Sequence, residues 1–538
     1  MNVIFVMADS FRYDNLSCYA ATSVKTPHLD RFAQQAIVFD NAYIGSFPTV
    51  PNRLDTMSGL FSFINYQWQP LPREIITLPQ LLSASGFITQ MIVDTPHLIG
   101  EGFNYCRDFD GWEWVRGQET DRWMTAPREV KLPAAVHKLR TPEIIKRHYR
   151  NSAWWQGEED HFVARTMQTA CRWLEQNQDQ EKFFLWVDTF DPHEPWDPPQ
   201  NYLELYEKGY TGEEPNYPQY CFWRDVMSEA ELNHNRALYM GEVSLVDRWV
   251  GVLLDKIDEL GMAEDTAVIF VSDHGFLFGE HGHIGKSYIR ELNGRMFYEA
   301  IPMYDDIRRI PLMIRIPGER GGRRIPALVQ TPDLMPTILE LAGLVSTETV
   351  GGQSRTQALQ CGVFDTQDWQ FKPEAIHGKS LMPLIRGETA RNRDLVICSN
   401  TLIHHSPLLA KCAVVTEDGW CLHHAGVYAA ERGAGGLAGV RLIDSAAAKI
   451  PTAPALYNLA ADPDEEQDVL AANEGLAHDI HQRYVKFLEE IGAPEQHLTG
   501  RRKLLRTGSC WLVTGAGPVQ QRLQPPPVSP TGRYACRS

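Results

Sequence analysis

Residues 3–9 read Val3-Ile4-Phe5-Val6-Met7-Ala8-Asp9, and this stretch decides the fold. Apolar residues follow one another without a polar break until an aspartate ends the run. A continuous apolar run of this length is typical of a strand that is buried on both faces of a parallel sheet. Because functional groups of such sheets gather at the carboxyl ends of the strands, Asp9 is expected to belong to a site.

Strand and helix patterns alternate along the sequence that follows. The predicted helices cover residues 27–33, 78–84, 158–176, 228–260 and 332–341, and the predicted strands cover residues 36–39, 87–93, 183–187, 266–271 and 310–316. The longest helix begins with a capping box, Ser228 with Glu231, and ends before Gly261. This alternation predicts an α/β fold with a mostly parallel central sheet flanked by helices.

The sequence divides into three parts of different character. Residues 1–385 are expected to form a catalytic α/β domain, residues 386–494 a smaller C-terminal α+β subdomain, and residues 495–538 a disordered tail. Five of the fourteen tryptophans fall within residues 100–156, where the alternation is interrupted. This Trp-rich insertion either lines a substrate pocket or forms a surface elaboration with its own aromatic cluster, and the sequence favours neither.

Composition limits the classes of function. With 43% hydrophobic and 22% charged residues, the chain has the composition of a globular protein. The formal charge of -17 argues against a nucleic-acid partner, but not against a small anionic substrate, because a metal and local cations can reverse the field inside a cleft. The sequence contains no recognisable membrane span or signal peptide, and its ten cysteines form no CxxC pair. We therefore expect a cytoplasmic protein with reduced thiols and no membrane partner.

Side chains that bind metals follow two of the predicted strands. Asp9 ends the first strand, and Asp273 and His274 follow the strand at 266–271. Carboxylates with one imidazole suit a single divalent ion, such as Ca²⁺, Mg²⁺ or Mn²⁺, and Zn²⁺ is also compatible. Asp188 follows a predicted strand as well, but aspartate is a common cap and turn residue, so a structural role is favoured there.

Thr49 stands between two prolines at the expected start of a helix that continues through Arg53. At a helix start, free backbone N–H groups and the helix dipole favour an anion such as sulfate or phosphate. Arg53 lies one turn later and can return to the same anion. A metal would lower the pKa of the Thr49 hydroxyl, whose oxygen would then complete the metal shell. The alternative is that Thr49 only caps the helix.

Taken together, these stretches resemble the sulfatase family of the alkaline-phosphatase-like superfamily. The segment Thr49-Val50-Pro51-Asn52-Arg53 aligns with the Cys/Ser-x-Pro-x-Arg signature of that family. The other segments that resemble family motifs are Asn2 to Arg12, Lys25 to Asp30, Asp191-Pro192-His193-Glu194-Pro195, Val271-Ser272-Asp273-His274-Gly275, Gly285-Lys286, and Leu456-Tyr457-Asn458-Leu459 with Asp462, Pro463 and Glu466. The resemblance covers roughly residues 1–490.

The resemblance implies an alkaline-phosphatase-like fold and a set of residue roles. The implied metal ligands are Asp9, Asp273, His274 and Thr49, and the last of these is also the implied nucleophile. The resemblance further implies that Arg53 and Lys286 bind the transferred anion, and that His193 meets the substrate or protonates its leaving group.

Two positions depart from the family pattern. Sulfatases carry a cysteine or serine at the position of Thr49 and oxidise it to formylglycine, and threonine is not a substrate for that modification. A plain threonine resembles instead the phosphodiesterase branch of the superfamily. Ser10 replaces a second acidic or amide ligand that many relatives carry after the first aspartate, which weakens the expected cation site.

The sequence therefore predicts a metal-dependent hydrolase of small anionic sulfate-type esters, in which Thr49 attacks in line. Phosphodiesters, phosphonates and phosphate monoesters are alternative substrates because of the hydroxyl at residue 49. A second alternative is a relative that binds an anionic ligand without turning it over.

Overall fold

The structure is a computed structural model, and it describes residues 1–292, 295–350, 353–358, 376–402, 411–425, 453–499, 501–502 and 504. The predicted tail at 495–538 falls almost entirely outside the described residues, so that expectation stays a prediction. The described residues at the start of this segment include a short helix, α14 (Glu495–Leu498).

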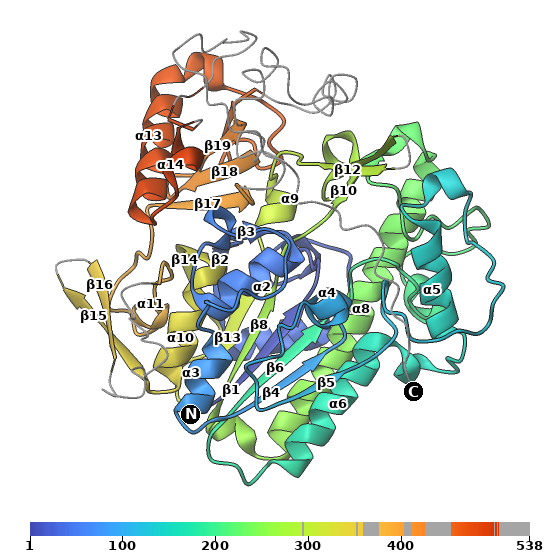
Figure 1. The fold of residues 1–538 in the computed structure, drawn as a ribbon, viewed down its shortest axis with the longest axis horizontal. Helices are drawn as coiled ribbons and strands as arrows, with labels where there is room; N and C mark the ends of the chain where they lie inside the picture. The colour runs from blue at the N-terminus through green and yellow to red at the C-terminus, as the bar shows by residue number, and fades with distance from the viewer. Residues whose placement is uncertain are drawn as a thin grey trace, which may run out of the picture.

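An eight-stranded sheet forms the centre of the larger part of the molecule (Figure 1). In spatial order its strands are β14 (Arg323–Gln330), β2 (Ile37–Tyr43), β13 (Leu312–Arg315), β8 (Thr266–Ser272), β1 (Asn2–Ala8), β6 (Phe183–Thr189), β4 (Ile88–Val93) and β5 (Gly111–Trp114). Every neighbouring pair is parallel except the two pairs that β13 makes. The predicted mostly parallel α/β sheet is confirmed.

Strand β1 is buried on both faces because the sheet lies between two layers of helices. Its residues alternate in direction, so Phe5 and Met7 face one hydrophobic cluster, while Ile4 and Val6 face another. The first cluster includes side chains of α2 (Thr49–Ser58), α3 (Leu78–Ala84) and α10 (Leu334–Leu341). The second includes side chains of α1 (Pro27–Gln35), α6 (Phe162–Gln176) and α8 (Glu229–Glu259). The unbroken apolar run at the start of the sequence is thus explained by burial on both sides.

Helix α8 begins where the sequence predicts. The Ser228 side chain accepts a hydrogen bond from the Glu231 N–H at 3.3 Å, and the Glu231 carboxylate accepts one from the Ser228 N–H at 2.7 Å. These two bonds satisfy N–H groups that would otherwise lack a partner at the helix start.

A second, smaller sheet lies beside the first, as expected for the C-terminal subdomain (Figure 1). Its strands in order are β20 (Ala455–Asn458), β19 (Trp420–Ala425), β18 (Lys411–Thr416), β17 (Leu395–Asn400) and β3 (Ser46–Phe47). Strands β18 and β19 pair as a hairpin, and α13 (Glu474–Glu490) packs against this sheet. Strand β3 belongs to the N-terminal part of the sequence and pairs in parallel with β17. The C-terminal sheet therefore includes the residues that directly precede the start of α2.

The Trp-rich insertion is more regular than the sequence indicates. It contributes β5 to the edge of the central sheet and contains α5 (Pro142–Ser152). Trp123 and Trp154 lie in contact, with ring centroids 6.1 Å apart, which supports a local aromatic cluster.

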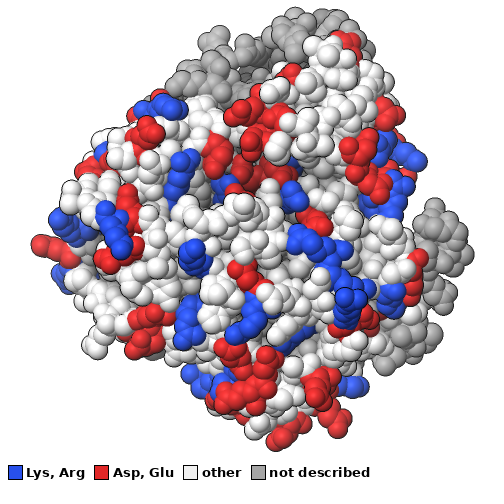
Figure 2. Space-filling view, turned by 180° about the vertical axis from the view of Figure 1, so that it is seen from behind, with Lys and Arg blue, Asp and Glu red and all other residues white. Residues whose placement is uncertain are grey.

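The surface carries charges of both signs. On the face seen in Figure 2, acidic side chains gather at several places and basic side chains lie between them. Among the described helices, none has the length and apolar character needed to cross a membrane.

A short helix, α9 (Asp305–Arg308), packs tightly against the segment that follows β8. A Cβ atom at Gly275 would lie 1.9 Å from the backbone oxygen of Asp306. We expect Gly275→Ala to lower the free energy of unfolding by about 1–3 kcal/mol, because backbone atoms must move to admit the methyl group. Chemical denaturation measures this difference.

The control is Gly475→Ala in the first turn of α13, where a Cβ would have nothing within 4 Å. It should leave stability unchanged or raise it by up to about 1 kcal/mol. Equal effects of the two substitutions would show that the close approach at Gly275 is not as described.

Candidate active site

Three neighbouring strands of the central sheet deliver the acidic residues of the site. Asp9 directly follows β1, Asp188 lies near the end of β6, and Asp273 and His274 follow β8. Since β8, β1 and β6 are adjacent and parallel, their carboxyl ends meet at one edge. One ligand atom from each of Asp9, Asp273 and His274 lies within 4.8 Å of the others, and all three residues are buried. The predicted convergence of these residues is present.

Arg53 is the centre of this group. Its guanidinium is fully buried and pairs with Asp9 at 3.0 Å, with Asp188 at 2.9 Å, and with Asp273. A buried carboxylate without a partner is strongly disfavoured, so one planar cation that reaches three of them is what allows the three strand ends to converge. Four of its five N–H bonds point at these carboxylates, which leaves one N–H of Nη2 for an anion.

Asp188 is a site residue that the sequence analysis assigned a structural role. Both of its oxygens accept from Arg53, and they also accept from the Thr95 hydroxyl at 2.6 Å and the Trp186 indole N–H at 3.0 Å. Asp188 lies within β6 rather than after it. Fully buried aspartates are almost always paired, so an aspartate set between the apolar run 183–187 and Phe190 is the signal that would have pointed to a partner.

The backbone around Thr49 is fixed by a buried carboxylate further along α2. Asp55 accepts hydrogen bonds from the N–H and hydroxyl of Ser46, both at 2.7 Å, and from the N–H of Ser62 at 2.7 Å. Pro48 occupies the N-cap position and Thr49 is the first residue of α2. Thr49 is therefore next to the cap and not the cap itself.

The Thr49 hydroxyl lies 3.4 Å from Nε2 of His274. Nδ1 of His274 lies 3.0 Å from the carbonyl oxygen of Gly275, which can only accept, so Nδ1 carries the proton and Nε2 presents its lone pair. Burial and the neighbouring Lys286 lower the pKa of His274 well below its usual value, which keeps the ring neutral. The Lys286 ammonium donates to the same Nε2 at 3.2 Å.

Ser10 positions Asp9 and Asp273, the two carboxylates that are expected to bind the metal. It has a positive φ of 59°, which turns its N–H toward Asp273 Oδ1 at 2.9 Å. Its hydroxyl donates to Asp9 Oδ1 at 2.9 Å. The residue that departs from the family pattern thus holds Asp9 and Asp273 in place.

His193 is held by its neighbour. Nδ1 of His193 donates to the Glu194 backbone oxygen at 2.6 Å, and its ring stacks on Phe190 at 4.0 Å. Burial, then Lys286 and Arg140, lower the pKa of His193 well below its usual value. Among the described residues, His193 makes no direct contact with Thr49 or with the aspartates that pair with Arg53.

The Trp-rich insertion reaches this side of the site through polar residues. Arg140 pairs with Glu194 at 3.1 Å and with Glu119 at 2.8 Å, and Tyr220 donates to Glu194. Sequence reasoning missed Glu194 and Arg140, because their partners are far away along the chain. The insertion therefore supports the loop that carries His193 and also contains its own aromatic cluster.

The residues present fit a divalent cation. Burial, and then the neighbouring Asp273, raise the pKa of Asp9 despite the cations of Arg53 and Lys286, so a bound cation would stabilise the charged form of this carboxylate. Two carboxylates and a neutral imidazole, whose Nε2 lone pair accepts from Lys286, make a donor set that divalent ions bind.

Comparison with known proteins shows the family. The profile of the family described as Sulfatase matches residues 1–344. An arylsulfatase of Clostridium perfringens is 24% identical over 392 residues, which span 66% of this chain and 77% of that protein. Iduronate 2-sulfatase of Mus musculus is 24% identical over 411 residues, which span 64% of this chain and 69% of that protein.

Solved structures share the fold. The phosphonate monoester hydrolase of Agrobacterium radiobacter has a TM-score of 0.63 and 18% identity, and the match covers 91% of this chain and 96% of that one. A protein solved in complex with its substrate D-glucosamine-2-N,6-O-disulfate has a TM-score of 0.59 and 19% identity, with 92% and 99% covered.

The Arg53–Asp188 pair can be tested through stability. We expect Asp188→Asn to lower the free energy of unfolding by about 3–5 kcal/mol, because it removes one partner of a buried ion pair. Chemical denaturation at neutral pH is the measurement.

Asp255→Asn is the matched control, since Asp255 pairs with Arg31 on the surface and both side chains are about half exposed. This substitution should lower the free energy of unfolding by at most about 1 kcal/mol. An Asp188 variant as stable as the Asp255 variant would contradict the role given to Asp188.

Proposed function

Because the chain belongs to the sulfatase family and is a hydrolase of the sulfuric-ester type, we propose that it cleaves small anionic sulfate esters with the unmodified Thr49 hydroxyl as nucleophile. One observation carries the proposal: the Thr49 oxygen lies 3.4 Å from a neutral imidazole nitrogen at the edge of a buried carboxylate cluster. A hydroxyl in such a place is shielded from water and close to groups that can activate it.

The cation site belongs to the same proposal. Asp9, Asp273 and His274 would hold one divalent ion, with Thr49 at its edge. When bound, such an ion lowers the pKa of an adjacent hydroxyl and offsets negative charge, so that Thr49 needs no separate base.

The remaining residues position the substrate and the cluster. Lys286 supplies a cation for the sulfate oxygens, and the free N–H of Arg53 supplies a further donor. The other Arg53 bonds hold the three aspartates. Since its pKa is lowered and its Nδ1 proton is held by Glu194, His193 is better suited to accept a hydrogen bond from the substrate than to give a proton to the leaving group.

The reaction then proceeds in two displacements. The Thr49 oxygen forms a bond to the sulfur in line with the leaving oxygen, whose bond to sulfur breaks. The leaving oxygen takes up a proton from solvent, and the Thr49 hydroxyl proton is released, so that the step yields an alcohol and a sulfate ester of Thr49. Water hydrolyses the resulting ester of Thr49 and releases sulfate.

Phosphonate and phosphate esters are the second candidate substrates. The observation that favours them is Thr49 itself, because an unmodified hydroxyl can attack phosphorus in the same geometry. A screen of aryl sulfate, phosphate monoester, phosphodiester and phosphonate esters separates the candidates by kcat/KM. If no ester is turned over while sulfate or phosphate still binds, the chain is instead a relative that binds anions without catalysis.

Substitution of the nucleophile is the sharpest test of the proposal. We expect Thr49→Ala to lower kcat for the best ester by at least about 1,000-fold, because the substitution removes the attacking oxygen. Thr49→Ser keeps the hydroxyl and should retain activity within about tenfold. A Thr49→Ala variant that keeps wild-type kcat would exclude Thr49 as the nucleophile.

Metal removal is a separate prediction. Dialysis against a chelator should abolish ester hydrolysis, and added Ca²⁺, Mn²⁺, Mg²⁺ or Zn²⁺ should restore it. Full activity after exhaustive chelation would rule out the cation at Asp9, Asp273 and His274, provided that mass spectrometry confirms that the protein holds no metal.

A further inference from the structure

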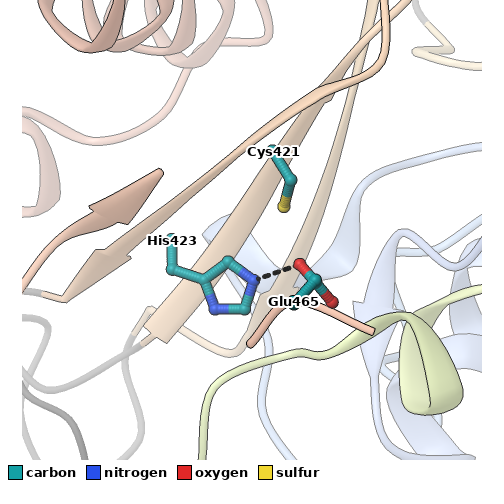
Figure 3. A group of neighbouring side chains, drawn as sticks. All are labelled: Cys421, His423 and Glu465. Atoms are coloured by element: carbon teal, nitrogen blue, oxygen red, sulfur yellow. Dashed lines mark hydrogen bonds and ion pairs between the residues drawn. The ribbon is translucent and has the colours of Figure 1, made fainter. Parts of the chain in front are cut away.

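We propose that Cys421, His423 and Glu465 form a second cation site, which takes a borderline divalent ion such as Zn²⁺ (Figure 3). Cys421 and His423 lie two residues apart on β19, so their side chains point to the same face of the C-terminal sheet. Glu465 comes from the turn after β20 and has a positive φ of 54°. One ligand atom from each residue lies within 4.8 Å of the others.

The donor set suits zinc better than calcium or magnesium. A thiolate, an imidazole and a carboxylate are all common zinc ligands, whereas calcium and magnesium prefer oxygen. All three side chains are buried. Nε2 of His423 lies 2.9 Å from Glu465 Oε1, and Cys421 lies beside this pair (Figure 3). Binding would exchange this contact for bonds to the ion, and the Cys421 thiol proton would pass to solvent.

Arg308 is the competing cation at this place. Its Nη1 donates to both Glu465 oxygens at 2.9 Å and lies 3.4 Å from His423 Nε2. The Asp305 carboxylate lies 3.2 Å from Arg308 Nη2 and offsets part of its charge. A carboxylate can accept several bonds, so Glu465 can be shared between the guanidinium and an ion, while Cys421 and His423 gain a cationic partner.

One member of the cluster borders a small hollow. His423 lines it together with Tyr304 and Tyr457, and its volume is about 20 Å³, enough for one water-sized group. Such a space beside the imidazole would leave room for a water as a further ligand of an ion.

Because of the position of the cluster, a bound ion would stabilise the contact between the C-terminal subdomain and α9. Glu465 accepts from the Asp305 N–H at 2.8 Å, so it joins the C-terminal subdomain to α9 of the catalytic domain. An ion at Cys421 and His423 would strengthen this junction. It would be distinct from the catalytic cation, because the two ligand sets share no residue.

Cobalt is a probe that tells the two sites apart. Thiolate ligation of Co²⁺ produces a charge-transfer band in the near ultraviolet, and the catalytic ligand set includes no cysteine. The full-length chain, freed of metal with a chelator, is titrated with Co²⁺. We expect a thiolate band that saturates at one equivalent and is lost in Cys421→Ser.

Cys412→Ser is the matched control, since Cys412 is buried on β18 opposite His424 and lies outside the cluster. It should keep the band. When the metal-freed proteins are titrated with Zn²⁺, the wild-type chain and the Cys412→Ser variant should each bind one more equivalent of zinc than the Cys421→Ser variant.

Two results would overturn the proposal. One is a wild-type spectrum without a thiolate band at saturating Co²⁺. This result is obtained on the wild-type chain alone and therefore does not depend on whether a variant folds. The other is a band that persists in Cys421→Ser or in His423→Gln. Either result would leave the cluster as an ion-pair network around Arg308. Ester hydrolysis is measured separately, so the outcome does not depend on the catalytic proposal.

Discussion

The buried ion-pair cluster around Arg53 is the interaction on which the rest of the structure depends. Three parallel strands carry aspartates near or just beyond their carboxyl ends, at one edge of the sheet, and these carboxylates would repel one another in a dry interior. The Arg53 guanidinium, fully buried, makes their convergence stable. Helix α2 carries both Arg53 and Thr49, so the residue that neutralises the strand ends also fixes the hydroxyl beside them.

The two sheets are connected through this same region. Strand β3 is the edge of the C-terminal sheet and leads directly into α2, and α9 links Glu465 to the segment that follows β8. The C-terminal subdomain therefore supports the positions of Thr49 and His274, although none of its described residues belongs to the group of Asp9, Asp273 and His274. Anything that strengthens the junction at Glu465 would stabilise the site from a distance.

The sequence predicted the parts of the fold and site that follow from local pattern. The apolar run before Asp9, the capping box at Ser228 and the spacing of Thr49 and Arg53 are visible along the chain, and the structure places them accordingly. The role of Asp188, the support of His193 by Glu194 and Arg140, and the addition of β3 to the C-terminal sheet depend on contacts between distant segments. Periodicity and spacing carry no information about such contacts, whereas a charged residue inside a buried strand does, and it should have raised the expectation for Asp188.

The most direct measurement is the identification of the residue that becomes covalently modified during turnover. The enzyme is mixed with a slowly released ester, quenched within the first turnover, and digested for mass spectrometry of its peptides. The account predicts a sulfuryl or phosphoryl group on the Thr49 hydroxyl, and no such group in the Thr49→Ala variant. A burst of product with the group on another residue, or with no residue modified, would contradict it.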